Sequence, residues 1–416
     1  MGINGNHGNH GNHGNNGNQG NQGNHGNNAS RIAANITGAH AAGVSDSGLS
    51  VAIMQCAEAL AGSWNGQEPG YWDGPQDFGY GQPYDKLRRL RSLDPSVMLT
   101  VLGAEAIAMF SVSGDGPTGP DVIVQAEGQE IARLAPPDAD MVVSQLPFLR
   151  MGAKLRDDRM AEILSQQGDI LSFFGAQQRL DVNARKWTIV LIQAFHSALA
   201  AHEYRVKYMC SVPRPVDLSP RVQPIIPTPG HSAYPSGHAT ESFAIATVLA
   251  ALRHFAVKDP ADPQRFASVL RDQLAVPYSE QGTNLDPLTQ ESAVAVQQLY
   301  RLASRIAENR TVAGVHYPVD SAHGAATGLM MALSFVCYCS DEMYHGDHVQ
   351  LVGNDWGQFA VGGNAAGDFT LGIWRDWLVN GWAVGAGAGT NPGGGQSWDQ
   401  LRAVWAGAVE EWKNTA

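Results

Sequence analysis

Seven stretches of this 416-residue chain repeat apolar side chains at the spacing of an α-helix. They cover residues 51–62, 95–112, 160–173, 185–206, 240–255, 292–307 and 322–338, and a last helix is expected over 398–412. Only residues 121–133 alternate as a short β-hairpin does. Amphipathic helices bury their apolar faces against one another. The pattern therefore predicts an all-α fold, a helical bundle with a minor β-hairpin.

Changes in composition divide the chain into three regions. Residues 1–30 consist largely of Gly-Asn-His, Gly-Asn-Asn and Gly-Asn-Gln triplets, which offer almost no apolar surface, so we expect a disordered tail. Residues 31–345 contain most of the periodic segments and are expected to form one α-helical domain. Residues 346–416 are rich in Gly and Trp, and we expect them to pack on the same domain.

The first candidate functional segment contains two cations, Lys207 and Arg214. It continues a helical-looking run, so the spacing of seven residues predicts both cations on one helix face, with Pro215 ending the run. A guanidinium can donate two parallel hydrogen bonds to an oxyanion, and an ammonium adds a compact charge. The pair suits phosphate or a phosphate-like ion.

The second segment, Pro235-Ser236-Gly237-His238, leads from a Pro- and Gly-rich loop into the apolar run 243–252. A helix start offers backbone N–H groups to an anion, and Gly237 lets the backbone come close to it. The Ser236 hydroxyl adds a donor, and His238 is expected in the first turn, facing the same place.

The third segment contains Arg310, His316 and Asp320. A carboxylate four residues beyond an imidazole can accept from one ring nitrogen, which fixes the tautomer and leaves the other nitrogen to act as nucleophile or metal ligand. Pro318 disfavours a continuous helix here, so we expect the Asp320 contact at a helix start.

Each segment alone also has a purely structural interpretation. A Lys-Arg pair at this spacing is usually part of a solvated helix face, and Pro-Ser-Gly-His is compatible with a turn and a helix cap. His316 and Asp320 alone are compatible with a structural hydrogen-bonded pair. Together, however, the segments supply three cations, two imidazoles and one orienting carboxylate, which favours a site for an oxyanion.

In order, the segments read Lys-x6-Arg-Pro, Pro-Ser-Gly-His and Asn-Arg-x5-His-x3-Asp. This pattern resembles that of the superfamily containing vanadium-dependent haloperoxidases, type 2 phosphatidic-acid phosphatases and bacterial acid phosphatases. The resemblance covers about residues 181–333, and Asn309 departs from it because the family usually has Ser there. It implies the helical-bundle fold of that superfamily, in agreement with the periodicity.

Residues 227–238 are similar to the corresponding stretch of algal vanadium bromoperoxidases, including His231, where chloroperoxidases carry an aromatic residue. The interval from His238 to Arg310 is longer than in small acid phosphatases. These features favour oxidation of bromide or iodide. Tyr204 departs from the Trp that members often have beside the halide pocket, and a loop-capping role for His231 is the alternative.

The resemblance implies that vanadate is the cofactor and that vanadium acts as a Lewis acid toward hydrogen peroxide. The residues implied to hold vanadate are Lys207, Arg214, Ser236, Gly237, His238, Arg310 and His316, with His316 as the metal ligand. The catalytic residues implied are Lys207, His231, His238, His316 and Asp320. Halide would leave as a hypohalous-acid equivalent that halogenates a small organic acceptor.

Two other functions use the same residues. A soluble acid phosphatase would use His316 as the nucleophile on phosphorus, Asp320 to orient it and His238 to protonate the leaving oxygen. A catalytically silent oxyanion-binding protein would bind the ion without turnover.

Charge and hydropathy limit the partners. The formal net charge of −12 argues against nucleic acid. The longest apolar run, residues 325–339, is shorter than the ~20 residues that a membrane span needs. We expect no membrane partner and, without a secretory signal pattern, a cytoplasmic location. The resemblance implies a homo-oligomer, a dimer or larger.

Overall fold

A computed structural model describes residues 54–59, 86–91, 93–114, 121–259, 262, 264–275, 287–352, 369–383, 385, 389–390 and 399–413, with only the backbone of 86–88, 287–292 and 379–380. The tail expected over residues 1–30 lies outside the described residues. Of the helix expected over residues 51–62, the part described, 54–59, is helical.

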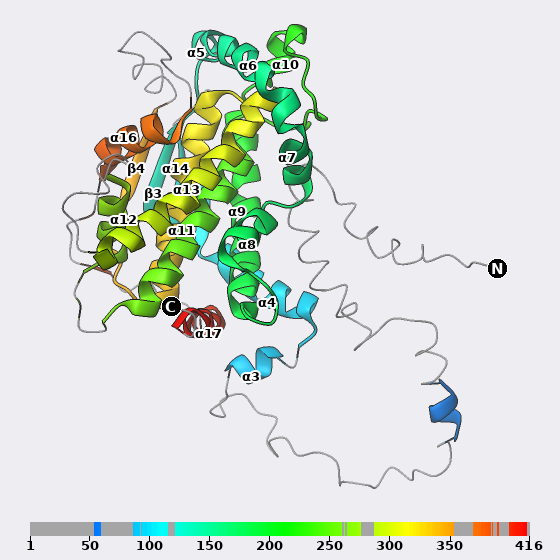
Figure 1. The fold of residues 1–416 in the computed structure, drawn as a ribbon, viewed down its shortest axis with the longest axis vertical. Coiled ribbons are helices and arrows are strands. Elements are labelled where there is room, and N and C mark those ends of the chain that lie inside the picture. The colour runs from blue at the N-terminus through cyan, green and yellow to red at the C-terminus, as the bar shows by residue number, and fades with distance from the viewer. Residues whose placement is uncertain are drawn as a thin grey trace.

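Four long helices form the centre of the molecule (Figure 1): α9 (Lys186–Cys210), α11 (Gly237–Val257), α13 (Pro287–Ala313) and α14 (Pro318–Ser340). Helix α11 packs along α14 and α13 and also contacts α9. Apolar side chains cover α11 and α14 on nearly every side, and the protein buries both helices almost completely. The sequence prediction of a helical fold is confirmed.

Shorter helices surround this centre. Helix α4 (Pro95–Ala108) packs on α9, and α17 (Asp399–Lys413) packs on α9 and α11. The other named helices are α3 (Lys86–Arg91), α5 (Ala139–Ser144), α6 (Leu146–Gly152), α7 (Arg156–Gly168), α8 (Leu171–Gln178), α10 (Pro215–Leu218), α12 (Phe266–Ala275) and α16 (Leu371–Gly381), with 3-10 turns η3 (Ala153–Leu155) and η4 (Pro220–Val222).

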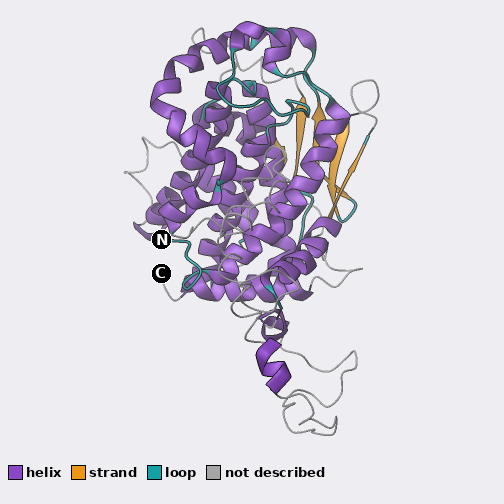
Figure 2. Ribbon diagram, turned by 90° about the vertical axis from the view of Figure 1, so that its right-hand side faces the viewer, coloured by secondary structure: helices purple, strands orange, loops and turns teal. Residues whose placement is uncertain are grey.

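A five-stranded sheet lies on one side of the helices (Figure 2). Its strands, in order across the sheet, are β1 (Phe110–Ser113), β2 (Val122–Ala126), β3 (Gln129–Ala135), β4 (His348–Val352) and β5 (Trp382–Ala383). The expected hairpin is confirmed as β2 and β3. Strand β4 joins β3 in parallel, and the other pairs are antiparallel. The sheet is larger than expected because β4 and β5 come from distant sequence and are short.

Two of the predicted helices differ from the structure, and α16 was not predicted. The helix predicted over 95–112 ends at Ala108, where the alternating burial of Phe110–Ser113 begins strand β1. The helix predicted over 160–173 is two helices, because Asp169 has extended backbone and its carboxylate accepts from the Ser172 N–H at 2.9 Å. Residues 371–381 form α16, a helix that the apolar periodicity did not predict, and the Thr370 hydroxyl caps it.

Two of the described helices, α11 and α14, are long and apolar enough to cross a membrane by length and composition. The sequence prediction that no segment reaches this length is therefore wrong, because α14 begins at Pro318, seven residues before the apolar run 325–339, and ends at Ser340. Inside the protein, 72% of the apolar window of α11 and 100% of that of α14 are buried. Core helices of soluble proteins pass the same test, so length and composition are weak evidence for a membrane span.

The elements after residue 345 make contacts with the helical centre. Trp374 of α16 is fully buried, and its indole N–H donates to the Ala322 carbonyl at 3.0 Å. The Glu411 carboxylate of α17 accepts from the backbone N–H groups of Trp187 and Thr188, at 2.7 and 2.9 Å, and so caps the start of α9. The division of the chain at residue 345 stays a prediction.

Candidate functional site: a buried group of cations and imidazoles

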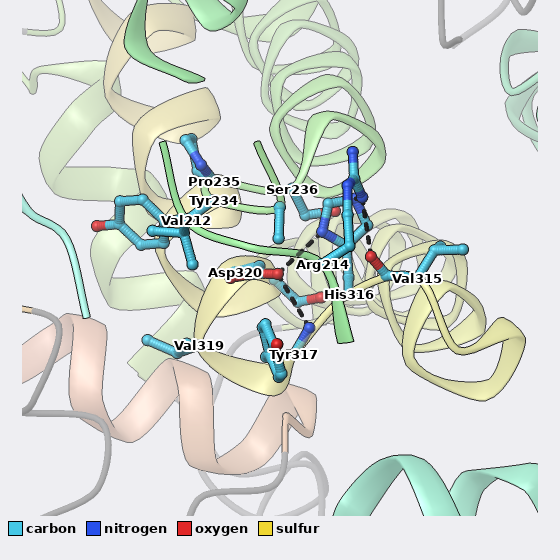
Figure 3. Close-up of polar contacts among 12 residues, drawn as sticks. Val212, Arg214, Tyr234, Pro235, Ser236, Val315, His316, Tyr317, Val319 and Asp320 are labelled. Atoms are coloured by element: carbon cyan, nitrogen blue, oxygen red, sulfur yellow. Dashed lines mark hydrogen bonds and ion pairs between the residues drawn. The ribbon is translucent and has the colours of Figure 1, made fainter. Parts of the chain in front are cut away.

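The three sequence segments meet at the end of the bundle where α9 and α13 finish and where α10, α11 and α14 begin (Figure 1). Figure 3 shows Arg214, His316 and Asp320 around the first turn of α14, with Ser236 from the loop before α11 beside them. Residues as far apart in the sequence as Lys207 and Asp320, which are separated by 113 positions, thus contribute to one candidate site.

Arg214 does not share a helix face with Lys207, so that expectation is wrong. Helix α9 ends at Cys210 because Ser211 adopts a left-handed backbone with φ of 50°. Arg214 has extended backbone and precedes Pro215, the first residue of α10. The turn at residues 211–213 positions the Arg214 guanidinium at the site. The seven-residue helical spacing from Lys207 does not.

The Lys207 ammonium is buried, with 1% of the residue exposed, and points at the loop before α11. It donates to the carbonyls of Ser232 at 3.3 Å and Pro235. Glu203, one helical turn earlier, places Oε1 at 3.8 Å from Nζ. Burial lowers the pKa of Lys207 to about 8, opposed by the Glu203 charge.

The Arg214 guanidinium is held in place by four hydrogen bonds. Nε donates to the His231 carbonyl at 2.9 Å, and Nη1 donates to the Val315 carbonyl at 2.8 Å. The remaining contacts are to two imidazoles: Nη1 to His316 Nε2 and Nη2 to His231 Nδ1, each at 3.1 Å. Burial lowers the pKa of Arg214 to about 10, so it stays a cation at neutral pH.

Ser236 is the N-cap of α11 and is completely buried, yet its hydroxyl has no hydrogen-bond partner among the described residues. Gly237 and His238 begin the helix and belong to the turn whose N–H groups lack intrahelical acceptors. Helix α14 comes very close here, because a Cβ on Gly324 would lie 2.5 Å from the Ser236 carbonyl oxygen. The first turn of α11 therefore offers several buried donors at one point.

Arg310 lies near the end of α13 and is also almost completely buried. Its Nη2 donates to the Gln166 side-chain oxygen at 2.9 Å, and its Nη1 lies 3.3 Å from His238 Nε2. That nitrogen of His238 is 3.0 Å from the Gln166 carbonyl, which can only accept, so Nε2 carries the proton. Arg310 Nε has no partner among the described residues. Burial lowers the pKa of Arg310 to about 9.

His316 and Asp320 make the contact expected at a helix start. Tyr317 is the N-cap of α14 and Pro318 its first residue, and Asp320 Oδ2 accepts from His316 Nδ1 at 3.0 Å and from the Tyr317 N–H at 2.9 Å. Burial raises the pKa of Asp320 to about 7. Burial and the Arg214 charge hold the pKa of His316 well below its usual value, so the ring is neutral. Because Nδ1 donates its proton to Asp320, the lone pair is on Nε2, which faces Arg214 Nη1.

His231 lies at a pocket of about 470 Å³ beside Arg214. The pocket is lined by residues of α10 and of the turns before α10 and α11: Ser211, Val212, Pro213, Arg214, Val216, Asp217, Thr228, Pro229, Gly230, His231 and Ser232. The His231 ring meets the Tyr204 ring edge to face, with centroids 5.3 Å apart. Burial, with the charges of Lys207 and Arg214, lowers the pKa of His231 to about 4 and keeps the ring neutral.

Arg156 of α7, which no sequence pattern singles out, joins the loop after α10 to the end of α13. Its guanidinium donates to the carbonyls of Val222, Gln223 and Val312 at 3.0, 2.8 and 3.0 Å. The carbonyls are 90 residues apart, from Val222 to Val312. This contact sets the position of the turn that leads from α13 to His316.

Sequence reasoning also missed Gln166 and Glu203. Glu203 had a usable signal, because a carboxylate four residues before a lysine shares its helix face. Gln166 had none, since a single glutamine on α7 cannot be assigned to an arginine 144 residues away. Among the described residues, no group of three or more His, Cys, Asp or Glu side chains is arranged to hold a metal ion directly. The buried side chains of Lys207, Arg214, Ser236 and Arg310 are instead hydrogen-bond donors.

Residues 186–344, from the start of α9 to just beyond α14, match the PAP2 superfamily. This range contains all three segments of the site, and members of the superfamily are usually enzymes of phosphatase or haloperoxidase type. The match supports that chemistry in general and does not choose between the two. No curated protein matches the chain.

Proposed function

We propose that the PAP2 superfamily domain of this chain binds vanadate and oxidises bromide and iodide with hydrogen peroxide, releasing a hypohalous-acid equivalent that halogenates a small organic acceptor. The observation that carries the oxyanion site is the pair of buried guanidinium groups of Arg214 and Arg310. Neither forms an ion pair with a carboxylate among the described residues. Buried cations of this kind favour an anionic ligand strongly.

The donors present fit a tetrahedral or five-coordinate oxyanion. Ser236 Oγ and Arg310 Nε are buried without partners, and the first turn of α11 adds backbone N–H groups. Lys207 and Arg214 contribute two more cations. These groups would neutralise the oxygens of vanadate, and His316 Nε2 would be the protein nitrogen that approaches the vanadium.

Proton movements can be assigned to atoms of this chain. Asp320 holds the His316 Nδ1 proton, so Nε2 keeps its lone pair directed toward Arg214 and the site. His238 donates from Nε2 to Gln166, so Nδ1 is the nitrogen that would take a proton from hydrogen peroxide. Bound vanadate would supply Lewis-acid polarisation of the peroxide.

The choice of haloperoxidase over phosphatase rests on the resemblance of residues 227–238 to bromoperoxidases, which includes His231. Arg214 contacts His231 at the wall of the pocket, and the His231 ring packs on Tyr204. A neutral imidazole there would adjust the hydrogen bonding of Arg214 without adding charge. The competing proposal is a soluble acid phosphatase, favoured by the fixed tautomer of His316, which prepares Nε2 for attack on phosphorus. A catalytically silent oxyanion-binding protein would bind without turnover.

The deciding experiment is peroxide-driven bromination of a phenol dye by the vanadate-free protein, with and without added orthovanadate. We expect bromination only with vanadate and suppression by phosphate, because both ions would occupy one site. Arg310→Ala should abolish this activity. Silence with both bromide and iodide would reject the haloperoxidase. Hydrolysis of a phosphomonoester, inhibited by vanadate, would then establish the phosphatase, and binding without either reaction would leave the silent protein.

A further inference from the structure

Glu203 lies behind the site in an unusual position for a carboxylate. It is on α9, one turn before Lys207, and only 4% of the residue is exposed. Neither of its carboxylate oxygens has a hydrogen-bond partner among the described residues. An isolated carboxylate in such a place is costly, so the nearby Lys207 ammonium, 3.8 Å from Oε1, matters to its ionisation.

The charged groups around this pair come from four elements. Glu203 is attracted by Lys207 on its own helix and by Arg214 before α10, and it is repelled by Glu241 of α11. Lys207 is attracted by Glu203, by Asp320 of α14 and by Glu241, and it is repelled by Arg214. Among these carboxylates, Glu203 has the largest effect on Lys207 and is the one within ion-pair distance.

Glu241 has other contacts and does not replace Glu203. Its Oε1 lies 3.1 Å from His196 Nε2, and its charge also acts on Arg310. Both partners of the Glu241–His196 contact are buried between α9 and α11. Glu203 is thus the carboxylate whose closest charged neighbour is Lys207.

Both groups of the pair titrate in the same range. Burial raises the pKa of Glu203 to about 8, opposed by the Lys207 charge, and burial lowers the pKa of Lys207 to about 8, opposed by the Glu203 charge. Below this range the pair is a neutral acid beside an ammonium. As the pH rises through it, Glu203 ionises and its negative charge keeps the proton on Lys207. A lysine buried to this depth without such a neighbour loses its proton at lower pH.

We infer that Glu203 is a positioning residue of the oxyanion site, which acts through Lys207 by keeping the ammonium charged when the solution becomes mildly alkaline. This inference rests on the proposed oxyanion site, and it applies to a haloperoxidase and to a phosphatase alike. It gives a function to a buried carboxylate that does not itself touch the ion.

The test is the affinity for tungstate as a function of pH, measured by calorimetry on the wild-type chain and on Glu203→Gln. Tungstate is a tetrahedral dianion that does not itself titrate near neutral pH. In mild acid both proteins carry a neutral residue 203 and a charged Lys207, so their affinities should be equal. A fall of about one unit in the pKa of Lys207, from about 8, should make the variant bind about fivefold more weakly near pH 8, and the difference should approach tenfold at higher pH.

A purely structural role for Glu203 predicts a different result, since a displaced Lys207 would weaken binding equally at every pH. That outcome, or equal affinities throughout, would overturn the inference. Glu203→Asp keeps a carboxylate and should restore at least part of the alkaline affinity, and it serves as the second variant if Glu203→Gln does not fold. Failure of the wild-type chain to bind tungstate at any pH would instead reject the proposed oxyanion site.

The matched control is Glu342→Gln, which removes a carboxylate from another lysine pair. Lys258 Nζ and Glu342 Oε1 are 3.4 Å apart, at the opposite end of α14 from the site. This variant should leave both the affinity for tungstate and its pH dependence unchanged. If Glu342→Gln also lost affinity for tungstate at alkaline pH, the loss in Glu203→Gln would not come from its contact with Lys207.

Discussion

At the residue scale, the hydrogen bonds of Arg214 connect two imidazoles of the candidate site, His316 and His231. Its Nη1 contacts His316 and its Nη2 contacts His231, so under the proposed function a change at His231 would act on the bound ion through Arg214. His231 remains neutral above about pH 4, because burial and two cations oppose its protonation. Its contribution is therefore a hydrogen bond rather than a charge.

Replacement of His231 tests that contribution. Bromide is harder to oxidise than iodide, so it should depend more on the hydrogen bonding around the site. We expect His231→Ala to lower the bromide rate by about tenfold and the iodide rate by less than about twofold, with kinetics compared at saturating vanadate. Tyr204→Phe keeps the ring packed against His231 and is the control. An unchanged bromide-to-iodide ratio would remove His231 from the site.

At the scale of elements, the close packing of α14 on the start of α11 positions the Ser236 cap. Gly324 permits this approach, since a Cβ there would meet the Ser236 carbonyl at 2.5 Å, well inside van der Waals contact. The atom that this Cβ would meet belongs to the Ser236 backbone, and Gly324 itself lies in a helix. Neither can make room by a change of side-chain rotamer. Helix separation is the remaining response.

Gly324→Ala should therefore lower the free energy of unfolding by ~1–3 kcal/mol and weaken oxyanion binding as the Ser236 turn moves. Denaturant unfolding and tungstate binding measure the two effects. Gly372→Ala in α16 is the matched control, because a Cβ there meets nothing within 4 Å, and it should be neutral or slightly stabilising. Wild-type stability and affinity in Gly324→Ala would contradict the packing argument.

At the scale of the whole molecule, the site joins the ends of helices that are distant in the sequence, so binding and folding are linked. An ion that binds only the folded chain at about 100 times its Kd adds about 2.7 kcal/mol to stability. For a chain of this size, the large entropy of unfolding turns that gain into a small shift, and we expect orthovanadate or phosphate to raise the Tm by ~3–4 °C. Thermal unfolding with matched ionic strength measures the shift.

Arg310→Ala should lose most of that shift, because it removes one of the buried guanidinium groups. An equal shift in the variant would mean that the ions act elsewhere on the chain. The expected homo-oligomer and cytoplasmic location stay predictions at this scale. The two apolar helices α11 and α14 are largely buried inside the protein, and their length alone does not assign a compartment.

The sequence by itself determined the local features of this protein. Helical periodicity predicted most of α9, α11, α13, α14 and α17, and alternation predicted β2 and β3, since side-chain patterns within one element set which face is buried. The contact of His316 with Asp320 was also predictable, because the two residues are four apart and Pro318 starts a helix between them. Short-range geometry is encoded in consecutive residues.

Tertiary structure alone decided which distant groups meet. The parallel pairing of β3 with β4 joins residues about 217 apart, from Ala132 to Val349, and no local pattern specifies such a partner. In the same way Gln166 reaches Arg310, and a left-handed Ser211 turns Arg214 away from the face of α9. These contacts depend on how whole helices pack. The sequence therefore identified the candidate site residues, while their mutual geometry followed from the fold.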